Sequence, residues 1–235
     1  MSHLISLLDF SRPLAFMFDL DGTILDSTRW HMQAYLETLD IYAPCKVSEL
    51  NEAGEAIIKR RRSEDVFLAL GFTGKEVVAK LVEHKRELYK AFIQNGNVCL
   101  FPRVKDLIDY LKSSKHRTLI FMTNSNNNTA TLCLEAHGLN EKFNDIVTEE
   151  QVVRGKPAPD IFQYALRRSK LEPSQAVTIE DSEIGIQASI AAGVPACLVN
   201  HEEDLPNVPV FGSVTKLYDR IRSDFEKAEK EWSCY

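Results

Sequence analysis

Short, nearly continuous apolar runs recur along the chain, and each is bounded by polar or turn-forming residues. A strand that is covered on both faces needs such uninterrupted apolarity, whereas a half-exposed strand alternates apolar and polar residues. The pattern therefore predicts parallel β-strands in the middle of a sheet. The runs are LAFMFDL at 14–20, RTLIFMTN at 117–124, AVTIEDS at 176–182 and PACLVN at 195–200, and NDIVTEE at 144–150 is a candidate for a further short strand.

Segments with helical spacing of apolar residues lie between these predicted strands. The spacing is found in residues 104–111, 131–135 and 161–166. An alternation of strands and helices is typical of a sheet whose parallel strands are joined by crossover helices. The sequence thus predicts an α/β fold with a doubly wound parallel sheet.

Residues 29–97 interrupt this alternation. They contain amphipathic helical patterns, such as TRWHMQAYLETL and GKEVVAKLVEHKRELYKAFIQNG, and no convincing strand. The segment SELNEAGEAIIKRRRSEDVFLALG between them also has helical character. We predict an all-helical insertion at 29–97 and a core formed by 1–28 and 98–235. Because the insertion directly follows an acidic loop, it is placed to fold over a site at that loop.

Composition and charge exclude several partners. The chain has 235 residues, of which 44% are hydrophobic and 26% charged, as in an ordinary globular protein. A net charge of -6 gives no general attraction to nucleic acid or to anionic membranes, and the basic run 59–62 is typical of a solvated helix face. No apolar run is long enough to span a bilayer, and the five cysteines are odd in number and far apart. We therefore expect a cytoplasmic protein with no nucleic-acid or membrane partner.

Polar clusters follow three of the predicted strands, and a lysine lies in a loop before a predicted helix. Turn formation or helix capping explains any one cluster alone. In an open parallel sheet, however, ligands bind beyond the carboxyl ends of the strands, so the clusters would meet. Their carboxylates would repel one another without a compensating cation. The members are Asp19 and Asp21, then Thr123, Asn124 and Ser125, then Glu180 and Asp181, and finally Lys156.

This set of side chains points to phosphate chemistry. Oxygen ligands without a group of histidines and cysteines favour Mg²⁺, which works beside phosphates. Lys156 and the donors that follow the second strand would hold an anion. In DLDGT, Asp19 can act as a nucleophile, and Gly22 permits the turn that brings Asp21 toward a leaving group as general acid and then base.

Four segments of the chain resemble the motifs of the haloacid dehalogenase-like (HAD) hydrolases, most of which are magnesium-dependent phosphatases. FDLDGT resembles the first motif, MTNS the second, GKPAPDIF the third and IEDSEIGIQASIAAG the fourth. They lie in the family's order and spacing within residues 14–200. The resemblance implies a HAD-like Rossmannoid core with an inserted helical cap.

The resemblance also implies roles for the motif residues. Asp19 would form an aspartyl-phosphate, and Asp21 would be the acid and base. Thr123 and Asn124 would bind the phosphoryl group, and Lys156 would stabilise Asp19 and the transferring charge.

By the same resemblance, Asp19, the main-chain carbonyl of Asp21 and Asp181 would hold Mg²⁺, with Glu180 in or beside its ligand shell.

The insertion resembles the helical cap of the subfamily that contains phosphoglycolate phosphatase and beta-phosphoglucomutase. His31 matches a position where beta-phosphoglucomutase has a histidine linked to acid/base control; the alternative is a histidine that only belongs to a helix face. RRRSEDVFLALG resembles a cap segment of that enzyme and makes Arg62 a candidate second phosphate contact. Ser125 is a further candidate substrate contact. His31 and Arg62 favour a substrate with an anionic distal group.

Three functions remain open on the sequence. The leading one is a magnesium-dependent phosphatase of a small phosphorylated metabolite, with sugar phosphates among the candidates. The second is a sugar phosphomutase that uses the same aspartyl-phosphate, and the third is a module that binds a phosphorylated ligand without turnover. Thr23 follows the D-G-T form of the phosphatases, whereas beta-phosphoglucomutases often have valine there. Metal-free dehalogenation is disfavoured because it gives Asp21 no role.

Overall fold

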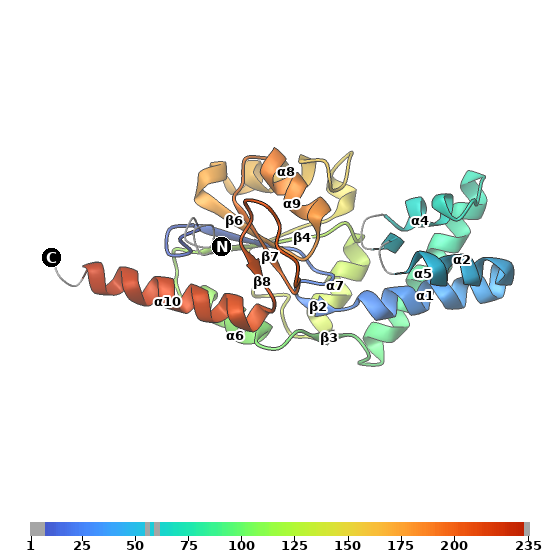
Figure 1. Cartoon of the computed structure of the whole chain (residues 1–235), viewed down its shortest axis with the longest axis horizontal. Helices are drawn as coiled ribbons and strands as arrows, with labels where there is room; N and C mark the ends of the chain where they lie inside the picture. The colour runs from blue at the N-terminus through green and yellow to red at the C-terminus, as the bar shows by residue number, and fades with distance from the viewer. Residues whose placement is uncertain (1–7, 55–56, 59–61, 233–235) are drawn as a thin grey trace.

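The computed structural model describes residues 8–54, 57–58 and 62–232. Within them, six parallel strands form the main sheet in the order β5-β4-β1-β6-β7-β8 (Figure 1). All five strand segments expected from the apolar runs lie in this sheet. The strands are β1 (Ala15–Phe18), β4 (Thr118–Met122), β5 (Asp145–Val147), β6 (Ala176–Glu180), β7 (Ala196–Val199) and β8 (Val210–Phe211).

Both faces of the sheet are buried, which explains the continuous apolar runs. In β1, Phe16 and Phe18 belong to one hydrophobic cluster and Met17 to another on the opposite face. Figure 1 shows α8 and α9 on one side of the sheet and α6 and α10 on the other. The doubly wound α/β fold is thus confirmed. The core helices are α6 (Val104–Lys112), α7 (Asn127–Ala136), α8 (Asp160–Ser169), α9 (Glu183–Ala191) and α10 (Val214–Trp232).

The C-terminal segment contributes more to the core than its polar sequence suggests. The sequence predicts a partly exposed helix from about residue 216, and α10 has that position. Its apolar side chains Leu217, Ile221 and Phe225 are buried in the cluster on the α6 side of the sheet. The helix is therefore a covering layer of the core.

The helical insertion has a hydrophobic cluster of its own. Tyr35, Leu50 and Phe67 are buried there against residues of the longest helix, and no strand occurs among the described residues between 28 and 97. The long helical pattern expected at 48–71 is interrupted, because one helix ends at Ala53 and Gly54 has a φ of 60°. The helices are α1 (Thr28–Tyr42), α2 (Val47–Ala53), α4 (Ser63–Ala69) and α5 (Lys75–Gln94).

A short antiparallel ribbon connects the insertion to the sheet. It consists of β2 (Leu25–Asp26) and β3 (Cys99–Leu100), so the chain enters and leaves the insertion at the same place. Two-residue strands carry no periodic pattern, and neither this ribbon nor β8 was predicted. Tyr89, in the C-terminal part of α5, belongs to the main hydrophobic cluster of the core. The insertion is thereby anchored beside the carboxyl ends of the strands.

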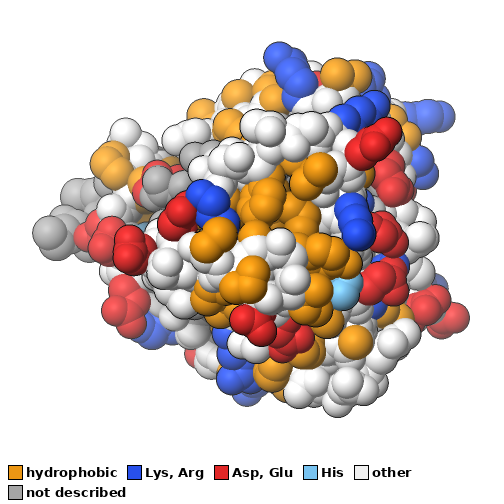
Figure 2. Space-filling model, turned by 90° about the vertical axis from the view of Figure 1, so that its right-hand side faces the viewer, with side chains coloured by type: hydrophobic (Ala, Val, Ile, Leu, Met, Phe, Trp, Pro, Cys, Tyr) orange, Lys and Arg blue, Asp and Glu red, His pale blue; other side chains and the backbone are white. Residues whose placement is uncertain are grey.

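Figure 2 shows the end of the molecule that the insertion forms, where hydrophobic side chains gather among charged ones. The insertion carries the exposed apolar side chains of Ile41, Tyr42, Leu68 and Val77. Of the basic run, only Arg62 is among the described residues. No described helix has the length and apolarity that a membrane crossing requires.

Candidate active site

Asp19 lies at the carboxyl end of the central strand β1. Its backbone N–H donates to the carbonyl of Ile179 in β6, at 3.1 Å, which continues the sheet up to the residue that carries the carboxylate. The Nζ of Lys156 lies 2.5 Å from Asp19 Oδ1 and 2.6 Å from Glu180 Oε1. The side chains of Lys156 and Glu180 are almost fully buried. One lysine from the loop before α8 therefore joins the ends of two strands.

Charge and burial oppose each other in this group. Burial alone would lower the pKa of Lys156, but the carboxylates of Asp19 and Glu180 raise it above its ordinary value. Burial raises the pKa of Asp19, and the positive charge of Lys156 opposes that rise. Lys156 thus stays charged and compensates the two carboxylates.

A cluster of carboxylates surrounds Asp19. Oxygen atoms of Asp19, Glu180 and Asp181 all lie within 4.8 Å of one another. Two glycines leave room for them: a Cβ at Gly22 would lie 2.0 Å from Asp181 Oδ2, and a Cβ at Gly185 would lie 2.0 Å from Glu180 Oε2. Hard oxygen donors in this number fit a divalent cation such as Mg²⁺.

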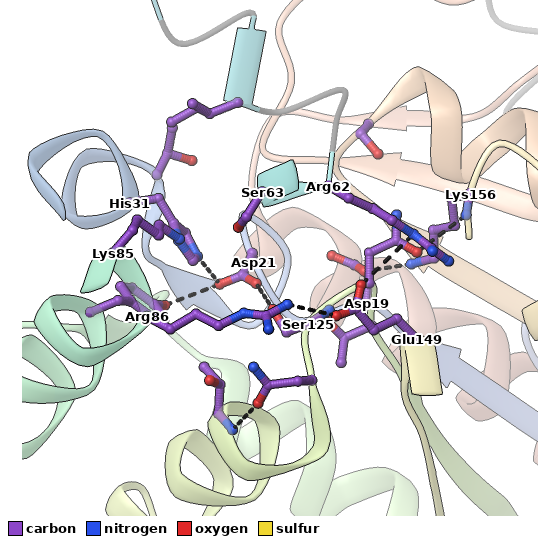
Figure 3. A pocket seen from close by; sticks show the side chains of 18 of the residues that line it. Asp19, Asp21, His31, Arg62, Ser63, Lys85, Arg86, Ser125, Glu149 and Lys156 are labelled. Atoms are coloured by element: carbon purple, nitrogen blue, oxygen red, sulfur yellow. Dashed lines mark hydrogen bonds and ion pairs between the residues drawn. The ribbon is translucent and has the colours of Figure 1, made fainter. Parts of the chain in front are cut away.

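Asp21 has a different environment, although it is only two residues away. Its Oδ1 accepts hydrogen bonds from His31 Nε2 at 3.0 Å and from the Tyr89 hydroxyl at 3.1 Å. Its Oδ2 accepts from the Ser125 hydroxyl at 3.2 Å (Figure 3). Burial would raise the pKa of Asp21, but His31 lowers it well below its ordinary range. Asp21 is therefore a carboxylate held mainly by the insertion.

His31 is itself oriented by a buried lysine. Lys85 Nζ lies 2.7 Å from His31 Nδ1, and the His31 ring stacks on Tyr89 with centroids 3.8 Å apart. Burial and the charge of Lys85 lower the pKa of His31, which favours the neutral ring. A neutral His31 can accept from Lys85 at Nδ1 only when Nε2 carries the proton. The hydrogen-bond chain then runs from Lys85 through His31 to Asp21.

The polar residues that follow β4 line the same cavity as Asp19 and Lys156. Thr123 is buried, and its Oγ1 accepts the backbone N–H of Ser125 at 3.0 Å. Asn124 Oδ1 accepts the backbone N–H of Lys156 at 3.2 Å. Among the three asparagines after them, Asn126 caps α7 by accepting the backbone N–H of Thr129. The second and third motifs are therefore hydrogen-bonded to each other.

The candidate substrate residue Arg62 lies on the insertion side of the cavity. Its Nε is 3.7 Å from Glu149 Oε2, and Arg86 Nη2 on α5 is 2.9 Å from Glu149 Oε1. Glu149 begins a 3₁₀ helix (Glu149–Gln151) that follows β5. The two arginines of the insertion thus pair with one glutamate of the core.

The sequence analysis missed several residues of this cavity, among them four that contact predicted site residues: Lys85, Arg86, Tyr89 and Glu149. A weak signal existed for Lys85, because it lies on the apolar face of α5, four residues before Tyr89 and after Leu81. A lysine on a buried helix face needs a polar partner. Glu149 carried no such signal. All the site residues predicted from the sequence line the cavity except Glu180, which lies beneath it as a partner of Lys156.

Comparison with known proteins places the chain in one class of hydrolases. A sequence model described as haloacid dehalogenase-like hydrolase matches residues 16–199. The chain belongs to this family. The predictions of the family, of the fold class and of a phosphatase-type hydrolase are thereby confirmed.

Individual relatives differ in their named activities. Fructose-1-phosphate phosphatase YqaB of Escherichia coli (strain K12) is 30% identical, with 80% of this chain and 96% of the relative covered. Beta-phosphoglucomutase of Bacillus subtilis (strain 168) is 27% identical, with 94% and 96% covered. The crystal structure of CbbY from Rhodobacter sphaeroides in complex with phosphate superimposes with a TM-score of 0.75 at 23% identity, covering 87% of this chain and 96% of that chain. That structure shows the shared fold.

Proposed function

We propose that this enzyme releases phosphate from a small phosphorylated metabolite through an aspartyl-phosphate on Asp19, with Mg²⁺ as its cofactor. The observation that carries the proposal is the separation of two neighbouring carboxylates into two environments. Asp19 lies 2.5 Å from the Lys156 cation within the acidic cluster, whereas Asp21 accepts three hydrogen bonds away from that cation. Two carboxylates in different environments can act as nucleophile and as acid/base.

In the first step, Asp19 attacks the phosphorus atom. Lys156 holds one carboxylate oxygen, which leaves the other free to form the new O–P bond. The bond from phosphorus to the leaving oxygen breaks, and Asp21, when protonated, gives that oxygen its proton. Thr123, Asn124 and Lys156 bind the phosphoryl oxygens and stabilise the charge that develops on them.

In the second step, water hydrolyses the aspartyl-phosphate. Asp21, now a carboxylate, takes a proton from the water as the water oxygen bonds to phosphorus. The O–P bond to Asp19 breaks, and inorganic phosphate leaves. The low pKa of Asp21 means that the free enzyme holds it as the carboxylate, the form that this second step requires, and its contact with His31 keeps it aimed at the cavity.

Asp19, Asp181 and the main-chain carbonyl of Asp21 are the proposed ligands of Mg²⁺, with Glu180 beside them. The close approach of Asp19, Glu180 and Asp181 supports this assignment. Bound Mg²⁺ neutralises charge on the transferring phosphoryl group.

Residues 29–97 are the proposed cap, and residues 1–28 with 98–235 are the proposed core. The separate hydrophobic cluster of α1, α2, α4 and α5 supports this division, as does the β2–β3 ribbon at its base. The cap supplies His31 to Asp21 and Arg62 to the cavity, so it takes part in substrate recognition. Its closure would exclude water from the reacting atoms.

A small sugar phosphate is the proposed substrate class. The named activity of YqaB supports it, and the cavity offers hydroxyl, amide and guanidinium groups that suit a polyol. We place the reaction in the cytoplasm, an expectation that the free thiols of Cys45, Cys99, Cys133 and Cys197 support.

A sugar phosphomutase is the second candidate. The contact between His31 and Asp21 favours it, and so does the similarity to beta-phosphoglucomutase. A hexose 1-phosphate supplied with a catalytic amount of the bisphosphate separates the two by product NMR. A 6-phosphate product without net phosphate release supports the mutase, whereas inorganic phosphate as the product supports the phosphatase.

The Asp19→Asn variant tests the proposed mechanism. We expect phosphate release to fall by about 10³-fold or more with every substrate of the wild type, because the amide is a poor nucleophile. Inorganic phosphate is measured with and without Mg²⁺ over a panel of sugar phosphates, phosphoglycolate and nucleotides. Asp26→Asn, an exposed aspartate in the same stretch, is the matched control and should keep full activity. Turnover retained by Asp19→Asn would reject the mechanism.

A further inference from the structure

Glu149 forms a charge cluster with Arg62 and Arg86 that the steps above do not use. Each carboxylate oxygen of Glu149 faces a different arginine, at 2.9 Å from Arg86 Nη2 and at 3.7 Å from Arg62 Nε. The Glu149 side chain is only 15% exposed, and all three residues line the cavity that contains Asp19 (Figure 3). The arginines come from the insertion and the glutamate from the core, so the cluster lies where the two parts meet at the cavity.

Arg62 is fitted closely onto the core loop that carries Lys156. A Cβ at Gly155 would lie 2.6 Å from both Nε and Nη2 of Arg62, so any larger residue there would push the guanidinium out of its observed position. The Nη2 atom is buried and has no hydrogen-bond acceptor among the residues that the structure describes. A buried donor without an acceptor is costly and marks a position for a ligand oxygen.

The charges in this part of the cavity are already partly balanced by the protein. Burial raises the pKa of Glu149, while Arg86 and Arg62 oppose the rise and favour its charged form. Glu64 and Glu150 also lie near enough to act on Glu149, and they add negative charge to the surroundings. Arg62 and Arg86 thus share Glu149 as their carboxylate partner, and the exposed Glu64 and Glu150 add negative charge nearby. The arginines can still donate hydrogen bonds to a ligand, but part of their positive charge is already compensated by the protein.

We propose that Glu149 is a specificity residue that selects phosphorylated substrates with an uncharged, hydroxyl-bearing distal end over substrates with a second phosphate. The inference deepens the proposed function and rests on it. It also reverses the preference for an anionic distal group that Arg62 suggested in the sequence alone.

The physical reason is competition for the same arginines. A second phosphate could pair with Arg62 and Arg86 only by displacing Glu149, whose carboxylate would then be left desolvated beside another anion. A hydroxyl or carbonyl oxygen needs no such exchange, because it can accept from Arg62 Nη2 while Glu149 stays in place. Selection thus comes from a repulsive element as well as an attractive one.

Glu149→Gln tests the proposal, because it removes the charge and keeps the size. Matched substrate pairs differ only in the distal group: fructose 1-phosphate with fructose 1,6-bisphosphate, and ribulose 5-phosphate with ribulose 1,5-bisphosphate. We expect the wild type to prefer the monophosphates in kcat/KM. In Glu149→Gln, kcat/KM for the bisphosphate divided by kcat/KM for the monophosphate should rise by at least about tenfold over the wild-type value. Adding Arg86→Gln should cancel that rise.

Glu87→Gln is the control variant. Like Glu149→Gln, it removes one negative charge near Arg86, because Glu87 is the next residue on α5. Glu87 is exposed, however, and pairs with Lys90 instead of with an arginine of the cavity. Its substrate ratio should equal that of the wild type. An unchanged ratio in Glu149→Gln, or a wild type that already prefers bisphosphates, would overturn the proposal.

Binding measurements separate failure of this inference from failure of the proposed function. Calorimetric titration of each substrate pair into Asp19→Asn protein, with and without the Glu149→Gln change, reports selectivity without turnover. When Glu149→Gln is added to Asp19→Asn, the dissociation constant of the bisphosphate should fall at least about tenfold relative to that of the monophosphate. No shift in this ratio rejects the role of Glu149 whether or not the wild type is a phosphatase. Circular dichroism melting confirms that each variant is folded.

Discussion

Gly22 and Asp181 are so close that a single methyl group on the glycine would lie 2.0 Å from the Asp181 carboxylate. Gly22 also has a φ of 83°, a conformation that side chains disfavour. The glycine of the first motif therefore serves both the turn after β1 and the position of an acidic side chain from the fourth motif. Two segments that lie 159 residues apart (181 minus 22) depend on each other at this point.

Gly22→Ala should therefore impair the metal site more than the fold. The left-handed conformation alone costs about 1–2 kcal/mol, whereas the overlap forces the Asp181 carboxylate to move. We expect Mg²⁺ affinity, measured by titration of activity and by calorimetry, to fall at least about tenfold. Gly96→Ala is the matched control, since Gly96 has a φ of 72° and no atom within 4 Å of the added Cβ. Equal Mg²⁺ affinities in the two variants would show that Asp181 does not hold the metal.

Lys156→Met should destabilise the protein as well as abolish activity. Without the cation, the buried Asp19 and Glu180 carboxylates lose their partner, and an unpaired buried charge costs about 3–5 kcal/mol. Urea unfolding should show this loss near pH 8. The loss should become smaller toward pH 5, because burial raises the pKa of both carboxylates and protonation removes their repulsion. Lys105→Met, at an exposed position of α6, should change neither property. A stability loss that is independent of pH would argue against carboxylate repulsion.

His31→Gln should affect the chemical step and its pH dependence. His31 holds the pKa of Asp21 low, so its removal should raise that pKa and move the acidic limb of the kcat profile to higher pH. Without His31, the general base Asp21 is no longer held in its orientation, which should reduce kcat by about 10- to 100-fold with little change in KM. His84→Gln, on α5 and packed against Tyr42, is the control. An effect on KM alone would make His31 a substrate contact and not a positioning residue for Asp21.

The strands and the motif residues were predictable because each rests on local sequence. Met17 and Phe18 point to opposite faces of a sheet that is covered on both sides, so the apolar run is continuous. Asp19 and Asp181 follow two such runs, and parallel strands bring their ends to one edge whatever the details of packing. The fold class and the convergence of the four motifs needed nothing more than these patterns.

The cap side of the cavity could not be predicted in the same way. Glu149 follows β5 like many loop residues, and its pairing with Arg62 and Arg86 depends on how the insertion packs against the core. Lys85 is one of several lysines on α5, and only the tertiary structure shows that it reaches His31. Contacts between the insertion and the core do not follow from the rule that parallel strands end at one edge, and they leave no periodic pattern in the sequence. The proposed specificity residues therefore became visible only in the structure.

Lys85→Met should change how stability depends on pH. Burial lowers the pKa of Lys85 from its ordinary 10.5 to about 7, although Asp21 opposes the shift. Between these two values the unfolded chain binds a proton at Lys85 that the folded protein does not, so the free energy of unfolding rises with pH across this window. Below about pH 7, both states are protonated and the cost of burying the charge, a few kcal/mol, is fully present.

Urea unfolding at pH 7, 8 and 9 should therefore show a free energy of unfolding that rises with pH in the wild type, with a weaker slope in Lys85→Met. Lys75→Met, at the exposed start of α5, should keep the wild-type slope. If Lys85→Met kept it too, Lys85 would not be the group that titrates in this window.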